Sequence, residues 1–425
     1  MSERAHRRPV VAVGTLRGTA AAWLSLRAAT AAWLALRGPA AAWLALAAVL
    51  LVLAPPPPSA NALEPGPTPS IAEPLPGWPR PIGMEATAFV LLDTSTGQVL
   101  AERSAEQRRP VASTVKVLTA LTALERVDLD EQVTVGEEVA GVPGSGVGLE
   151  PGDTWSVQEL VDGIIARSGN EAAEALAVHV AGSRDAFLRL MEEDAAAIGV
   201  QGLELVSVSG LDDDNLLSAM DLALISQAAL DHDVLGPILA QRQVTIPGEG
   251  TVTSRNLLLA SYPEATGVKT GFTTAAGNSL IGSAAREDRE LIAVILDAGD
   301  DPGRFDAAGR LLDLGFDAYS LRELSADLRF AVAGGQVRVV VDEVQLVLPR
   351  AQDAGLQLPI GARPPDRDTR VPVLLDGTEV THVPAVLDRS RAPTPAGSAE
   401  ADLGRAAVDG VYAALRARAA SDALG

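Results

Sequence analysis

Residues 110–116 read Pro-Val-Ala-Ser-Thr-Val-Lys, and a helical pattern of apolar residues begins at Ser113. Because residues three apart share a face at the start of a helix, the amine of Lys116 can reach the hydroxyl of Ser113. A helix N-terminus also offers free N–H groups that suit a developing oxyanion. A serine needs an adjacent base to act as a nucleophile, and Lys116 can be that base if its pKa falls well below about 10.4. On its own, however, S-x-x-K is a common pattern.

The use of lysine makes the pair more specific. Of the 34 basic residues, 32 are Arg, and the two lysines are Lys116 and Lys269. Arginine stays charged and cannot act as a base, whereas a desolvated lysine can lose its proton. Both lysines lie within short motifs, which favours a chemical role for each.

Two further motifs follow along the chain. Ser168-Gly169-Asn170 lies in a predicted loop between two helices, 55 residues after Ser113. There, the hydroxyl of Ser168 can relay a proton, and the amide of Asn170 can hold Lys116 or a substrate. Lys269-Thr270-Gly271 begins another 101 residues on. On a strand, its cation and hydroxyl can bind a carboxylate, and Gly271 permits close approach of a ligand.

The composition excludes several other kinds of site. The net charge of −21 disfavours binding to nucleic acid and gives no general attraction to anionic membranes. No cysteine is present, and the four histidines are scattered, so neither thiolate chemistry nor a histidine metal site is expected.

The N-terminal region has the composition of an export signal. Residues 1–62 carry early arginines, an apolar stretch from Ala40 to Ala54 and an Ala60-Asn61-Ala62 cleavage pattern. We expect a signal peptide, with an uncleaved anchor as the alternative. Residues 63–84 are rich in proline and are expected to be an extended linker.

An α/β catalytic domain is predicted over residues 85–322, in which the sheet pairs the beginning of the chain with its later part. A hairpin at 87–98 comes first. A capping box at Ser156 opens a helix through about residue 166. Further helices are expected over 171–181, 184–197, 218–231 and 303–315, and late strands over 267–272, 278–285 and 290–297. Short β-rich runs predict a separate small β domain over 323–390. Residues 391–425 are interpreted as a linker and a possible terminal helix over 401–418.

The order S-x-x-K, S-x-N, K-T-G is that of β-lactamases and penicillin-binding proteins. With the blocks PVASTVKVLTA, LVDGIIARSGNEAAEALA, SRNLLL and GVKTGFTTAAGNSLIGSA, the chain resembles the D-alanyl-D-alanine carboxypeptidases, the low-molecular-mass penicillin-binding proteins of the S11 serine peptidases. The resemblance covers about residues 85–316. It implies an antiparallel sheet packed with helices, together with an all-helical subdomain.

The resemblance also implies a mechanism, a substrate and a location. Such enzymes remove the terminal D-alanine of peptidoglycan stem peptides through an acyl-enzyme, are acylated by β-lactams, need no cofactor and work outside the cytoplasm. Any membrane contact is expected only through an uncleaved N-terminal segment. The roles that it implies are nucleophile for Ser113, general base for Lys116, proton relay for Ser168, positioning for Asn170, carboxylate recognition for Lys269 and Thr270, an oxyanion hole from the N–H groups of Ser113 and Phe272, and a place near the site for Arg304.

Two alternatives stay open at this point. A class A-like β-lactamase shares the three motifs but needs Ser-Asp-Asn and a deacylating glutamate, whereas this chain has Gly169 in place of that Asp and only Glu204 at a comparable distance. A non-catalytic cell-wall binding or β-lactam-sensing protein on the same scaffold is the other. The intact set of catalytic residue types argues against it.

Overall fold

The computed structural model describes residues 78–332, 335–350, 356–358, 369–375, 378–391 and 413–414. The expected leader over 1–62 lies outside these residues, as do most of the expected linker and most of the C-terminal tail. Trp78 and Met84 of the expected linker are buried against the core, and the ring of Trp78 packs edge-on against Tyr319 at 5.9 Å. The final residues of that segment are therefore part of the folded structure.

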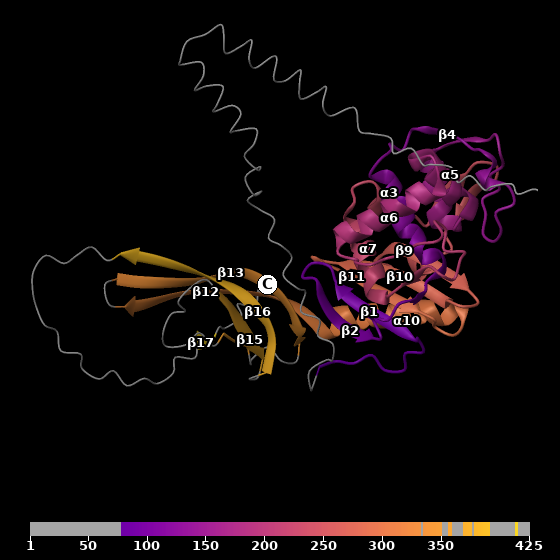
Figure 1. Cartoon of the computed structure of the whole chain (residues 1–425). Helices are drawn as coiled ribbons and strands as arrows, with labels where there is room; N and C mark the ends of the chain where they lie inside the picture. Colours follow the sequence, from indigo (N-terminus) through magenta and orange to yellow (C-terminus); the bar gives the residue numbers. More distant parts are fainter. Residues whose placement is uncertain are drawn as a thin grey trace, which may run out of the picture. The chain divides into compact units, whose positions relative to one another are not determined.

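A five-stranded antiparallel sheet forms the base of the catalytic part, in the order β2-β1-β11-β10-β9 (Figure 1). Its strands are β1 (Ala88–Asp93), β2 (Gln98–Arg103), β9 (Ala265–Thr273), β10 (Gly277–Arg286) and β11 (Arg289–Leu296). The hairpin at the start of the chain pairs with the last of the late strands, since β1 lies next to β11. This pairing of early and late strands confirms the predicted arrangement. It leaves β9 as an edge strand.

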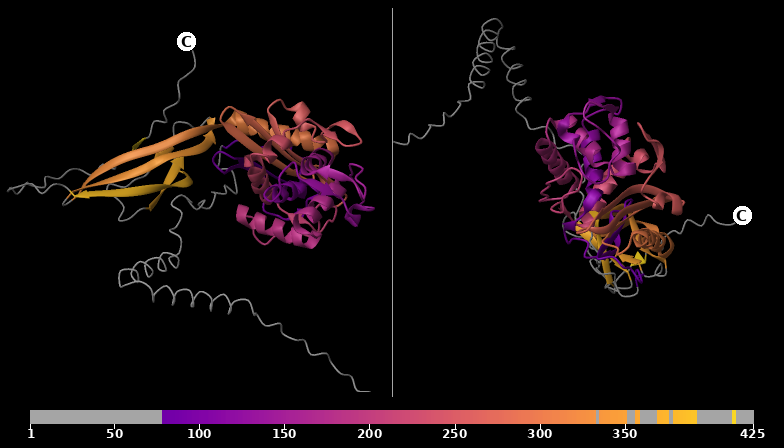
Figure 2. Two further views of the ribbon diagram at one scale, coloured as in Figure 1. Left: turned by 90° about the horizontal axis from the view of Figure 1, so that it is seen from above. Right: turned by 90° about the vertical axis from the view of Figure 1, so that its right-hand side faces the viewer.

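Helices lie on both faces of this sheet (Figures 1 and 2). The long helix α10 (Asp301–Ala318) packs on one face, against apolar residues such as Leu280 and Leu291. On the other face, Val90 and Val294 join the core of the helical part. The two apolar faces of the sheet thus fill two separate cores.

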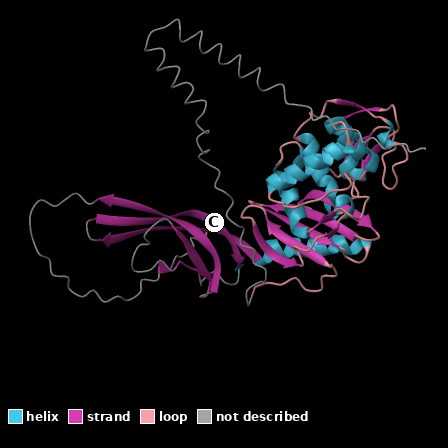
Figure 3. Cartoon of the chain, viewed as in Figure 1, coloured by secondary structure: helices cyan, strands magenta, loops and turns pink. Residues whose placement is uncertain are grey.

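The helical part on this second face carries two of the three motifs (Figure 3). Its helices are η1 (Ala112–Val115), α3 (Lys116–Leu124), η2 (Glu137–Val139), α4 (Val157–Asp162), η3 (Gly163–Arg167), α5 (Asn170–Ala181), α6 (Arg184–Ile198), α7 (Ala219–Asp231) and α8 (Leu235–Leu239). The short helix α9 (Leu258–Ser261) instead contributes Leu258 to the core that α10 fills. Short strand pairs accompany them, namely β3 (Arg109–Pro110) with β6 (Leu216–Leu217), β4 (Gln132–Thr134) with β5 (Thr154–Ser156), and β7 (Gln243–Ile246) with β8 (Gly250–Thr253). The helices predicted over 171–181, 184–197 and 218–231 are present as α5, α6 and α7.

The predicted capping box is also present. Ser156 accepts a hydrogen bond from the N–H of Glu159, and Glu159 accepts one from the N–H of Ser156. The predicted helix does not continue unchanged to residue 166, however, because η3 is a wider π turn. Such turns occur often at functional sites. This one ends at Ser168, which has a left-handed φ of 64°.

A second, six-stranded antiparallel sheet follows α10, in the order β12-β13-β16-β15-β14-β17. Its strands are β12 (Tyr319–Val332), β13 (Gly335–Pro349), β14 (Leu356–Leu358), β15 (Thr369–Leu375), β16 (Thr378–Arg391) and β17 (Ala413–Ala414). The β-rich character predicted for this region is present, and β12 begins before the expected boundary at 323. Of the expected terminal helix over 401–418, only Ala413 and Ala414 are described, and they pair with β14.

Candidate active site

The nucleophile motif lies where edge strand β9 packs against η1. Ser113 occupies the 3-10 turn that leads into α3, and Lys116 is the first residue of α3. In a 3-10 turn residues three apart lie above one another, so the two side chains meet. The Nζ atom of Lys116 lies 2.9 Å from Oγ of Ser113. The predicted pair is therefore in contact.

The other partners of Lys116 fix the direction of its amine. Nζ donates to Oδ1 of Asn170 at 2.7 Å and to the carbonyl oxygen of Ser209 at 2.6 Å. Both of these atoms can only accept, whereas the hydroxyl of Ser113 can also donate. A neutral amine uses its two N–H groups on the two acceptors, which leaves its lone pair facing Ser113. This is the arrangement of a general base.

The environment of Lys116 favours the neutral amine. Its side chain is fully buried. Burial lowers its pKa well below the ordinary value, the nearby charge of Lys269 lowers the pKa further, and that of Glu171 opposes the shift. Loss of solvation penalises the charged form of a lysine. The lowered pKa that a general base requires is therefore found for Lys116.

The second and third motifs meet each other directly. Lys269 is buried, and its Nζ donates to Oγ of Ser168 at 3.0 Å. Burial, followed by the charges of Arg255 and Arg304, lowers its pKa to about 7. The structure thus brings the three motifs together through two lysine-centred sets of hydrogen bonds.

The close approach of β9 to η1 depends on Gly271. A Cβ atom at this position would lie 2.9 Å from the carbonyl oxygen of Val111 and 3.2 Å from the backbone nitrogen of Thr114. Arg304 holds the same strand from α10, because Nη1 donates to the carbonyl oxygen of Gly271 at 3.0 Å. Arg304 also forms an ion pair with Asp301. Arg304, which the resemblance places near the site, thus contacts the strand that carries the third motif.

These groups border a cavity of about 180 Å³. It is lined by Ser113, Ser145, Ser168, Arg255, Thr270, Gly271, Phe272 and Arg304. Lys116, Asn170 and Lys269 are buried and are not part of this lining; Lys116 contacts it through Ser113, and Lys269 through Ser168. Glu204, the glutamate whose distance along the sequence is comparable to that in a class A β-lactamase, is exposed and does not line the cavity.

Sequence reasoning missed Ser145 and Arg255. Arg255 donates to Oγ of Ser145 at 2.5 Å, across 110 residues of sequence. Arg255 belongs to the SRNLLL block, but the resemblance implies no role for this arginine. Ser145 lies in the glycine-rich stretch 144–148. Only the folded chain shows that the two residues face the same cavity.

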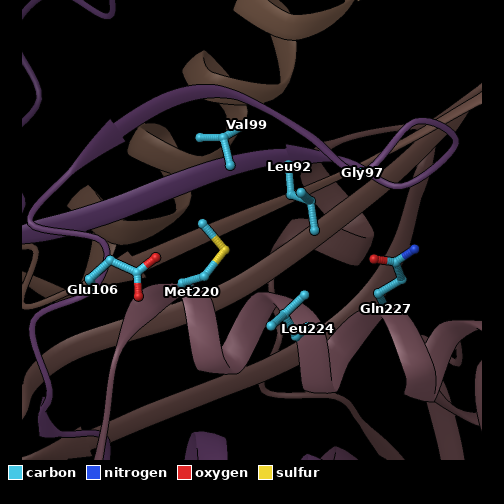
Figure 4. Close-up of a pocket in the computed structure, with 7 residues that line it drawn as sticks. All are labelled: Leu92, Gly97, Val99, Glu106, Met220, Leu224 and Gln227. Carbon is cyan, nitrogen blue, oxygen red and sulfur yellow. The ribbon is translucent and has the colours of Figure 1, made fainter. Parts of the chain in front are cut away.

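A second hollow lies away from these residues, between the β1–β2 hairpin and α7 (Figure 4). Its volume is about 220 Å³, and its walls include the apolar side chains of Leu92, Val99, Met220 and Leu224. It contains none of the predicted site residues. In the described part of the chain, no group of three or more His, Asp or Glu side chains is arranged to hold a metal ion.

Comparison with known proteins identifies the family of the chain. A sequence model of the D-alanyl-D-alanine carboxypeptidase family, peptidase S11, matches residues 77–300. The chain belongs to this family. Its expected membership, fold and enzyme class are thereby confirmed.

Named relatives match more than half of this S11 chain. It is 35% identical over 257 residues to D-alanyl-D-alanine carboxypeptidase DacB2 of Mycobacterium tuberculosis, which covers 58% of this chain and 86% of the relative. It is 36% identical to DacC of Escherichia coli, over 55% of this chain and 62% of that protein. The solved structure of penicillin binding protein 6B from E. coli matches with a TM-score of 0.62 and 29% identity, over 73% of this chain and 98% of that one.

Proposed function

We propose that this S11 peptidase removes the terminal D-alanine from peptidoglycan stem peptides that end in D-Ala-D-Ala, and that β-lactams acylate the same serine. The observation that carries this proposal is the contact between the buried amine of Lys116 and Ser113, with the lone pair of the amine free for the hydroxyl proton. A serine with an adjacent base is the starting point for acyl transfer. The names of its relatives supply the substrate class.

Acylation begins with Ser113. Its Oγ attacks the carbonyl carbon of the penultimate D-alanine while Lys116 takes the hydroxyl proton. The carbonyl oxygen becomes an oxyanion, which the backbone N–H groups of Ser113 and Phe272 receive. The tetrahedral intermediate then expels the amine of the terminal D-alanine, and the hydroxyl of Ser168 passes the proton to that amine. Attack by water on the ester frees Ser113 and the shortened peptide.

Substrate binding is assigned to the wall formed by β9. Lys269 and Thr270 receive the terminal carboxylate of the substrate, and Arg255, which also lines the cavity, adds a second cation. Gly271 lets the substrate backbone lie along the strand edge. Asn170 acts from behind by holding the amine of Lys116.

We further propose the division of the chain that the composition indicates. Residues 1–62 direct export, the catalytic part acts outside the cytoplasm, and the β sheet from Tyr319 onward forms a separate small domain. The 73% coverage in the match to the E. coli penicillin-binding protein supports the last point, because it extends beyond the length of the catalytic part. No helix in the described part of the chain is long and apolar enough to span a membrane.

The deciding experiment is mass spectrometry of a stem pentapeptide that ends in D-Ala-D-Ala after incubation with the protein. Loss of one alanine is expected, and Ser113→Ala should abolish it. An unchanged peptide under conditions in which Ser113 is acylated by penicillin would favour the sensing alternative. Rapid multiple-turnover hydrolysis of penicillin would favour a β-lactamase.

A further inference from the structure

Glu171 is a buried acidic residue that the proposed chemistry does not use. It follows Asn170 as the second residue of α5, and only 6% of it is exposed. Its Oε1 accepts hydrogen bonds from the backbone N–H groups of Val147 at 2.5 Å and Gly148 at 3.1 Å. Two charge-assisted bonds from one carboxylate fasten a loop firmly. The carboxylate therefore ties the loop at 143–148 to the start of α5.

The loop is shaped to receive this carboxylate. A Cβ atom on Gly146 would lie 2.5 Å from Oε1 of Glu171, so any larger residue there would displace the acid. Val147 is buried, and its Cγ1 would lie only 3.1 Å from a Cβ atom on Gly163 and 3.3 Å from one on Gly169. The fit thus depends on both the carboxylate and the small residues around it.

The same loop supports the catalytic amine through Asn170. The carbonyl oxygen of Ser145 accepts from the backbone N–H of Asn170 at 2.8 Å, and that of Pro143 accepts from its side-chain amide at 2.7 Å. Oδ1 of Asn170 in turn accepts from Lys116. A loop that moves therefore changes the orientation of Asn170, and with it the aim of the Lys116 amine.

Glu171 also contributes a negative charge close to that amine. Its Oε2 is buried and has no hydrogen-bond partner among the described residues. The charged groups that act on Lys116 are Lys269 and Arg255, which lower its pKa, and Glu171 and Glu174, which raise it. Glu171 is the larger of the two acidic contributions.

We infer that Glu171 is a positioning residue, which fastens the 143–148 loop beside the active site and balances the positive charges around Lys116. This inference rests on the proposed function, because it assumes that Lys116 is the base. It assigns Glu171 no contact with the substrate. Its two roles, as an anchor and as a charge, can be separated by substitution.

Glu171→Gln removes the charge and keeps an oxygen that can accept both loop N–H groups. Loss of a negative neighbour lowers the pKa of Lys116 further, so the base form persists to lower pH. The acidic limb of the kcat/KM profile for D-alanine release should therefore move to lower pH, with KM little changed. Glu174→Gln is the matched control, since it removes a more weakly acting charge that makes no bond to the loop; a smaller shift in the same direction is expected.

Glu171→Ala removes the anchor as well, and kcat/KM should fall by about 10- to 100-fold, because small displacements of catalytic groups have effects of this size. Gly146→Ala should lower the activity of the wild-type protein by displacing the carboxylate, yet have little further effect in Glu171→Ala. Such non-additivity is the mark of a direct interaction. If Glu171→Ala does not fold, Gly146→Ala still tests the anchor and Glu171→Gln still tests the charge.

The outcomes for the inference and for the proposed function are distinct. A wild-type protein that neither releases D-alanine nor is labelled by a fluorescent penicillin counts against the proposed function. An active wild type with the same pH profile in Glu171→Gln contradicts the charge role. Equal losses from Gly146→Ala with and without Glu171 contradict the anchoring role.

Discussion

The Nζ atom of Lys269 lies 3.0 Å from Oγ of Ser168, although 101 residues separate them in the sequence. The bond joins edge strand β9 to the turn that precedes α5, and Ser168 lines the cavity. Lys269 is buried and flanked by Arg255 and Arg304, and its pKa is lowered to about 7. A substrate carboxylate would offset these positive charges and favour the protonated lysine.

The effect of replacing Lys269 on activity should therefore depend on the C-terminal group of the substrate. Lys269→Ala is expected to lower kcat/KM by about 10- to 100-fold for peptides with a free C-terminal carboxylate, the range for a lost hydrogen bond to a charged group. Peptides with an amidated C-terminus should lose much less. Steady-state kinetics on the matched pair of peptides measures the ratio. Equal losses on both would contradict carboxylate recognition.

The pH dependence of acylation should follow the protonation state of the Lys116 amine. Its base form is required, so acylation should be retained above the lowered pKa of Lys116 and lost as the pH falls below it. Lys269→Gln removes a positive neighbour, which raises the pKa of Lys116 and should move the acidic limb to higher pH. The rate of labelling by a fluorescent penicillin across pH gives both curves. A shift to lower pH, or none, would contradict the coupling between the two lysines.

Removal of the base should abolish efficient acylation. Lys116→Ala is expected to lower the labelling rate of Ser113 by about 10²- to 10⁴-fold, the usual contribution of a general base. Lys116→Arg, which keeps a cation but cannot act as a base at neutral pH, should be equally slow. Labelling that proceeds at the wild-type rate in either variant would assign the base elsewhere.

A buried ion pair joins the end of β1 to the start of β11 and allows a test of stability. Nη2 of Arg289 lies 2.8 Å from Oδ2 of Asp93, which is fully buried, and Nη1 donates to the carbonyl oxygens of Gly315 and Tyr319. Arg289→Leu leaves the Asp93 carboxylate without this partner and should lower the free energy of unfolding by about 3–5 kcal/mol. Denaturant unfolding measures this loss. Arg338→Leu is the control, because its ion pair with Asp327 is about half exposed and should contribute about 1 kcal/mol or less.

Much of the fold could be predicted because its signals are local. The capping box at Ser156 and the apolar periodicity after Ser113 depend on neighbours within a turn or two. The predicted boundary at residue 323 falls inside β12, which begins at Tyr319, since no breaker separates α10 from this strand. The π turn before Ser168 has no sequence signature either. It is held by long-range contacts, such as the hydrogen bond from the N–H of Arg255 to the carbonyl oxygen of Ala166.

The site could be predicted where its residues carry distinctive chemistry. Two lysines in a chain that otherwise uses arginine identified Lys116 and Lys269 without any structure. Ser145 and Glu171 could not be found in this way, because a serine in a glycine-rich loop and an acid at a helix start are ordinary in sequence. Their importance arises from the packing of the 143–148 loop on α5.

The last prediction tests the close packing of β9 against the nucleophile turn. In Gly271→Ala, the new methyl group meets the carbonyl oxygen of Val111 at 2.9 Å and Cγ2 of Thr114 at 3.0 Å. Backbone atoms cannot yield as a flexible side chain does, so the strand must move away from Ser113, and D-alanine release should fall by about tenfold or more. Gly309→Ala on α10 is the control, because the nearest atom to its Cβ is 3.9 Å away. It should keep full activity and raise stability slightly, by up to about 1 kcal/mol. Full activity in Gly271→Ala would show that the separation between β9 and η1 does not limit the reaction.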